Sequence, residues 1–111
     1  MDDCVFCNIA NKTIESKIEF EDDKLMVIRD ILPKAPVHFL VIPKKHILSV
    51  NHVEEVDEPM VGEMIFVARR MAEKFGISET GYKLIFNVGR DGGMVVPHLH
   101  LHLMGGKNLE E

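Results

Sequence analysis

Residues 98–103 alternate histidine and leucine in the order His98-Leu99-His100-Leu101-His102-Leu103. In an extended strand, alternate side chains point to the same face, so this pattern predicts a strand with imidazoles on one face and leucines on the other. The leucine face can pack on a helix. The histidine face has to meet water, a ligand or a metal, because buried imidazoles need polar partners. We predict that this strand runs from His98 to Met104 and that Gly105-Gly106 ends it.

The rest of the pattern predicts a single α+β domain over residues 1–111. The clearest helix runs from Asp57 to Phe75, because apolar residues recur there at three- and four-residue intervals. Asp57 can cap its start and Gly76 is a natural stop. The other expected strands are Lys17–Phe20, Leu25–Arg29, His38–Ile42 and Tyr82–Val88, with His38–Ile42 buried on both faces, and Cys4 to Asn11 forms a compact turn or short helix. One main helix with an antiparallel meander makes an α+β domain.

Charge and hydropathy argue against two classes of partner. The formal net charge is −5 and no block of lysine and arginine is present, so we expect no nucleic-acid partner. A small phosphorylated ligand remains compatible, because one pocket needs only a few local donors. The acidic start lacks the basic segment and apolar run of a signal peptide, and apolar runs such as Phe39–Ile42 are too short to span a membrane. We therefore expect a cytoplasmic protein with no membrane partner.

The histidine face is suited to phosphate chemistry. Neighbours on one face of a strand lie about 6.6 Å apart, so one imidazole can attack phosphorus while the next donates a hydrogen bond to a phosphate oxygen. Neutral imidazole is a competent nucleophile near pH 7. The glycine-rich turn at Gly92-Gly93 can bring backbone N–H groups close to an anion, and Asn87 can add an amide donor. A metal shared by the histidines, or a solvated face without function, also fits the strand pattern.

The pair Cys4-Val5-Phe6-Cys7 has the spacing of half a zinc site. A closed tetrahedral site needs two further ligands, for which His46 and one histidine of the strand are candidates. A redox pair or two free thiols are the alternatives that spacing alone leaves open.

Three motifs of the chain resemble the histidine-triad (HIT) family, and in particular its Hint-like branch of the purine nucleoside phosphoramidase type. They are the triad His98 to Met104, the segment Asp30 to His46, and Asn87 to Gly93. The resemblance implies an antiparallel sheet of about five strands with one long helix and a short N-terminal helix. It also implies a homodimer whose sheets join across the interface.

The resemblance further implies roles for individual residues. His100 would be the nucleophile, which forms a covalent nucleotidyl-histidine intermediate, and His102 would contact the phosphate. The remaining substrate-binding positions would be Asn87 and the Gly93 backbone at the phosphate, Asp30 at the ribose, and Ile28 and Ile31 at the base. Cys4, Cys7, His46 and His98 would hold a structural zinc ion.

The activity implied is hydrolysis at the α-phosphate of purine nucleoside phosphoramidates or aminoacyl adenylates. A purine-nucleotide-binding regulatory protein and a dinucleoside polyphosphate hydrolase are the alternatives. One position departs from the family pattern, because Val95 stands where relatives often have a serine that is thought to help the leaving group. We expect Val95 to lie at the substrate and to alter the preference for the leaving group.

Overall fold

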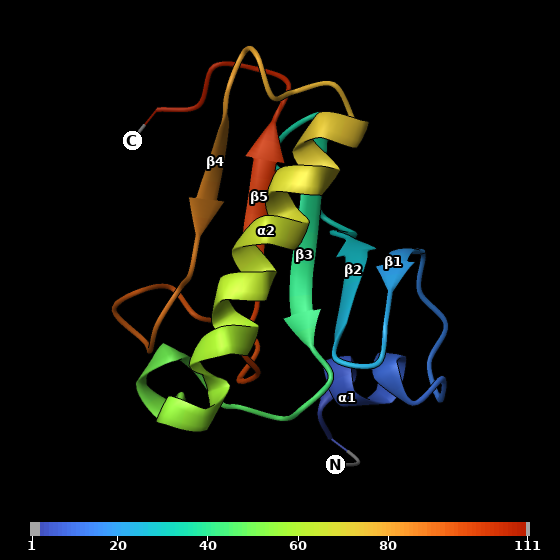
Figure 1. Cartoon of the computed structure of the whole chain (residues 1–111), viewed down its shortest axis with the longest axis vertical. Helices are drawn as coiled ribbons and strands as arrows, with labels where there is room; N and C mark the ends of the chain where they lie inside the picture. Colours follow the sequence, from blue (N-terminus) through green and yellow to red (C-terminus); the bar gives the residue numbers. More distant parts are fainter. Residues whose placement is uncertain (1–2, 111) are drawn as a thin grey trace.

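The computed structural model describes residues 3–110, which form two α-helices, two short 3-10 turns and five strands. In chain order these are α1 (Val5–Ala10), β1 (Ile18–Glu21), β2 (Leu25–Arg29), β3 (Val37–Pro43), η1 (Val50–His52), η2 (Glu55–Asp57), α2 (Glu58–Lys74), β4 (Tyr82–Ile85) and β5 (Leu101–Gly105). The strands form one antiparallel sheet in the order β1-β2-β3-β5-β4, and Figure 1 shows α2 crossing one face of it. The predicted α+β architecture with a five-stranded sheet, a long helix and a short N-terminal helix is therefore confirmed.

The two faces of the sheet are covered by different helices. On one face, Leu99, Leu101 and Leu103 are buried in the main core with the inward side chains of α2, which are Met64, Val67, Ala68, Met71 and Ala72. On the other face, Phe6 and Ile9 of α1 form a second apolar cluster with Met26, Ile28, Leu40 and Ile42. Strand β3 lies between the two clusters and is buried along nearly its whole length, as predicted for His38–Ile42. The predicted division of leucines and histidines between two faces thus holds.

The histidine strand begins later than predicted, at Leu101 instead of His98. The register pairs Val41 of β3 with Leu101, so continuing the ladder would bring Leu99 opposite Pro43. Proline has no N–H to donate, and the Leu99 N–H instead donates to the Ile47 carbonyl at 2.7 Å. His98 and His100 therefore lie on an irregular segment that leads into β5.

The strand β4 also ends earlier than predicted, at Ile85 instead of Val88. Its last partner is His102 on β5, and β5 itself starts only one residue before that. Phe86 to Val88 therefore have almost no strand to pair with, and they lead into the glycine-rich turn.

The long helix is confirmed, but the carboxylate of Asp57 does not cap it. Asp57 stands at the N-cap position without a side-chain bond into α2. Its carboxylate instead accepts hydrogen bonds from the Lys45 ammonium at 2.7 Å and the Glu54 N–H at 3.1 Å. The helix ends as predicted, since Gly76 follows it with a φ of 75°, a conformation that favours glycine. None of the helices among residues 3–110 is long and apolar enough to cross a membrane.

Candidate active site

His98 faces the cysteines and is fully buried. Its Nε2 lies 2.8 Å from the Pro43 carbonyl, which can only accept a hydrogen bond, so Nε2 carries the proton. The unprotonated Nδ1 lies 3.2 Å from Cys4 Sγ and 3.6 Å from Cys7 Sγ. A histidine nitrogen with a free lone pair aimed at two thiols is in the state that metal binding requires.

His46 completes a cluster of four ligand atoms from distant parts of the chain. Its Nδ1 lies 3.3 Å from Cys7 Sγ and 3.1 Å from His98 Nδ1, and all four ligand atoms lie within 4.8 Å of one another. Ligands around a tetrahedral zinc ion would be separated by roughly 3.3–3.8 Å, given bonds of about 2.3 Å to sulfur and about 2.05 Å to nitrogen. The spacing and the Cys₂His₂ chemistry therefore fit zinc.

The electrostatics of the cysteine pair favour a cation between the ligands. Burial, followed by the neighbouring Cys4 thiol, raises the pKa of the Cys7 thiol. Both cysteines are free thiols. Two adjacent thiols become thiolates at neutral pH only when a positive charge stabilises them.

His100 has a defined tautomer. Its Nδ1 lies 2.7 Å from the His98 carbonyl, so Nδ1 donates and the lone pair is on Nε2. No residue among 3–110 hydrogen-bonds this Nε2. The ring is 7% exposed and lies 5.0 Å from the His102 ring, centroid to centroid. A fixed, neutral imidazole with an unoccupied lone pair is a nucleophile ready for use.

His102 is oriented by a residue that the sequence analysis did not assign a role. The Lys34 N–H donates to His38 Nδ1 at 3.1 Å, which leaves the proton of His38 on Nε2. That nitrogen lies 2.9 Å from His102 Nδ1 and 3.3 Å from the Asp30 carboxylate. His102 therefore accepts at Nδ1 and carries its own proton on Nε2. His38 thus makes His102 a hydrogen-bond donor at the nitrogen that remains available.

The pKa values of this pair keep it neutral at neutral pH. Burial, followed by the neighbours His100 and His38, lowers the pKa of His102 to about 4. Burial also lowers the pKa of His38, although Asp30 acts in the opposite direction. Asp30, His38 and His102 are close enough to hold a metal. The Lys34 amide argues against it, because His38 can offer a lone pair at Nε2 only by moving its proton to the nitrogen that accepts from Lys34.

The three triad histidines therefore have three separate tasks: His98 faces the thiols, His100 presents a lone pair, and His102 presents a donor. This division argues against a single metal held by all three. A family model for the HIT domain matches residues 11–109. The chain belongs to the HIT family. The resemblance drawn from the sequence motifs is confirmed.

Relatives of this HIT chain include enzymes. It is 44% identical to a purine nucleoside phosphoramidase of Escherichia coli K12 over 108 residues, which cover 97% of this chain and 91% of the relative. A solved HIT family hydrolase from Legionella pneumophila is 44% identical, with a TM-score of 0.95 over 97% of this chain and 96% of that one. A histidine triad protein from Clostridium difficile is 40% identical, with a TM-score of 0.96 over 100% and 96%.

The glycine-rich turn of this HIT chain is held together by donors that were expected at the phosphate. Asn87 Nδ2 donates to the Gly92 carbonyl at 2.8 Å, and the Gly93 N–H donates to the Arg90 carbonyl at 3.0 Å. The Asn87 amide has a second hydrogen free for a ligand. The Gly93 N–H has none, so its expected phosphate contact needs a change in this turn. A Cβ at Gly92 would lie 2.3 Å from the Val88 carbonyl oxygen, so only glycine fits there.

The residues expected at the nucleoside differ widely in burial. Ile28 is buried in the second apolar cluster, whereas Ile31 and Val95 are each 88% exposed. The Asp30 carboxylate accepts from the Leu32 N–H at 2.8 Å, which shapes the loop that carries Ile31. Their expected contacts with substrate stay predictions.

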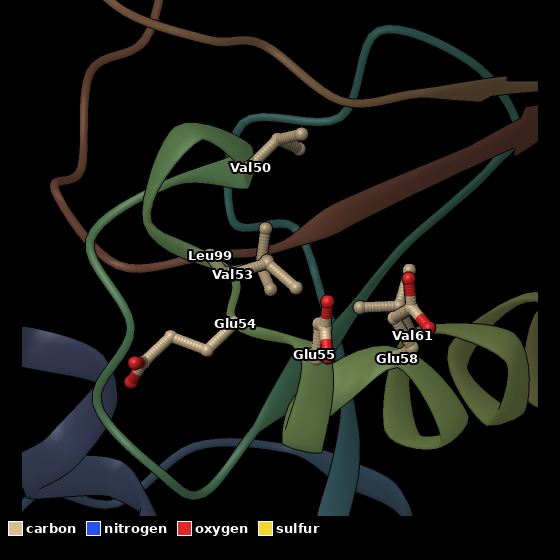
Figure 2. Close-up of a pocket in the computed structure, with 7 residues that line it drawn as sticks. All are labelled: Val50, Val53, Glu54, Glu55, Glu58, Val61 and Leu99. Carbon is tan, nitrogen blue, oxygen red and sulfur yellow. The ribbon is translucent and has the colours of Figure 1, made fainter.

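A cavity of about 370 Å³ lies away from the imidazoles. It is lined by Val50, Val53, Glu54, Glu55, Glu58, Val61 and Leu99, and Figure 2 shows the glutamates around Val53 and Leu99. Leu99 belongs to the leucine side of the sheet, so this cavity is not the site of the histidine chemistry.

Proposed function

We propose that this chain hydrolyses purine nucleoside phosphoramidates, or related nucleotidyl conjugates such as aminoacyl adenylates, through a covalent bond to His100. One observation carries the proposal: the His100 lone pair on Nε2 stands beside a His102 ring whose proton is fixed on Nε2. A nucleophile and a donor are thus side by side, as attack on a phosphate requires. The similarity to a purine nucleoside phosphoramidase supports the substrate class.

The proposed reaction has two displacements at phosphorus. His100 Nε2 attacks the α-phosphorus, the new N–P bond forms, and the bond to the leaving amine breaks as that amine takes up a proton. Water then attacks the same phosphorus and releases the nucleoside monophosphate, and His100 returns to its neutral form. The His102 Nε2–H and the second Asn87 N–H donate to phosphate oxygens as negative charge builds up, an effect of several kcal/mol in comparable sites. In this proposal Asp30 holds the ribose, and Ile28 and Ile31 hold the base.

Replacing His100 by alanine tests the proposal. Turnover of adenosine phosphoramidate should fall below detection in His100→Ala, while the affinity for AMP, measured by calorimetry, should stay within about threefold because binding uses other residues. Normal turnover in this variant would refute the nucleophile assignment. If AMP binds and even the wild type turns over neither phosphoramidate nor dinucleoside polyphosphate, the regulatory alternative is favoured instead.

We also propose a structural zinc ion at Cys4, Cys7, His46 and His98. When bound, it would tie the N-terminal segment to the strand that carries the triad. The distances among the four ligand atoms and the protonation of His98 support this assignment.

The chain is further proposed to be a single-domain homodimer in the cytoplasm. Strand β4 lies at one edge of the sheet, and an exposed edge tends to pair with another strand. Ile65 and Phe66 on α2 are also unusually exposed for apolar residues, at 46% and 57%. Both cysteines are free, which suits a reducing compartment.

A further inference from the structure

Helix α1 places one aromatic ring against two histidines of the triad. Phe6 is 5% exposed, and its ring meets His98 at 5.7 Å and 84° and His100 at 5.2 Å and 72°, measured between ring centroids and planes. Both are edge-to-face contacts, the favourable arrangement for such rings. A single side chain therefore touches a ligand of the cysteine–histidine cluster and the nucleophile.

The His100 ring needs this contact to be fully fixed. Its hydrogen bond from Nδ1 to the His98 carbonyl sets the tautomer, but the torsion between Cβ and an aromatic ring is broad. Phe6 packs against the ring and limits its swing about that bond. The position of the attacking Nε2 thus depends on where Phe6 lies.

The position of Phe6 depends in turn on the cysteine–histidine cluster. Helix α1 has six residues, too few to be stable without tertiary contacts. Cys4 stands at its N-cap and accepts from the Cys7 N–H, and both thiols face His98. Phe6 lies between these two cysteines in the sequence, so whatever fixes them fixes its ring.

We propose that Phe6 is a positioning residue that couples occupancy of the Cys4–Cys7–His46–His98 site to the geometry of His100. Loss of the metal loosens α1, the Phe6 ring moves, and the nucleophile loses its alignment with phosphorus. The inference rests on the proposed function in one respect, namely that His100 is the nucleophile.

Two variants of α1 separate positioning from general stability. Phe6→Leu should lower kcat for adenosine phosphoramidate by about 2- to 10-fold, the range that one aromatic contact supports, with KM changed less than twofold. It should also shift the NMR resonances of the His100 ring. Ile9→Val is the matched control, since Ile9 is buried in the same cluster and makes no ring contact with His98 or His100; it should leave kcat and the His100 resonances unchanged.

Removing the metal tests the coupling itself. Chelation of the wild type without substrate should shift the His100 ring resonances in the same direction as Phe6→Leu, and added Zn²⁺ should reverse the shift. In Phe6→Leu, chelation should move them much less. If Phe6→Leu does not fold, Phe6→Met takes its place, because it keeps the volume and removes the ring.

Two outcomes would overturn the inference. One is a folded Phe6 variant with unchanged kcat, or with a raised KM alone, since that places Phe6 at the nucleotide. The other is a wild-type His100 signal that ignores chelation. Activity retained in His100→Ala would instead refute the proposed function, and the NMR comparison would still decide whether Phe6 links the two sites.

Discussion

Replacing His38 by leucine should impair the reaction although His38 has no place at the phosphorus. The His38 side chain is 1% exposed and its Nε2–H holds His102 at 2.9 Å. Without that donor, His102 can place its own proton on Nδ1, and Nε2 then presents a lone pair to a phosphate oxygen. The lost contact is one hydrogen bond to a charged group, worth about 1.5–3 kcal/mol. We therefore expect kcat/KM to fall by about 10- to 100-fold.

The matched control is His38→Gln. The glutamine amide nitrogen can stand close to where the imidazole Nε2 stood and donate to His102, so this variant should recover a substantial part of the lost rate. The assay is steady-state hydrolysis of adenosine phosphoramidate, with thermal unfolding to confirm that both variants fold. A folded leucine variant with wild-type kcat/KM, or equal loss in both variants, would refute this account of His102.

Three further predictions follow from the geometry. The pKa of His102 is about 4 in the folded chain against 6.5 for an ordinary histidine, so the unfolded state binds more protons between these values. The free energy of unfolding in urea should then rise with pH from about 4 to about 6.5, and His102→Asn should flatten this rise. Gly92→Ala should damage the turn and the activity, because its Cβ would meet the Val88 carbonyl, whereas Gly62→Ala, with nothing within 4 Å, should stabilise α2 by about 0.5–1 kcal/mol. Metal analysis should find one zinc per chain in the wild type and a substoichiometric amount in Cys7→Ser.

The parts of the site that follow a repeating pattern could be predicted from the sequence. Alternation placed the histidines and leucines on opposite faces, and the three- and four-residue spacing located α2. The start of β5 could not be found in this way, because the strand loses its partner at Pro43, which is distant in sequence and becomes relevant only once the register is known.

The residues that orient the histidines were the harder part. His38 is the lone histidine in the apolar run from Val37 to Pro43, and it shares a face with Leu40, which pairs with His102. That isolated polar residue was the available signal. No comparable signal marks Phe6, since a phenylalanine in a short helix is compatible with any core, and only the tertiary packing brings it to His100.

The stereochemical course at phosphorus tests the central claim most directly. Adenosine phosphoramidate made chiral at phosphorus with sulfur can be hydrolysed in ¹⁸O-labelled water, and the configuration of the product then determined. Attack by His100 followed by attack by water inverts the centre twice, so we predict overall retention. Net inversion would mean that water attacks the substrate directly, and it would contradict a covalent bond to His100.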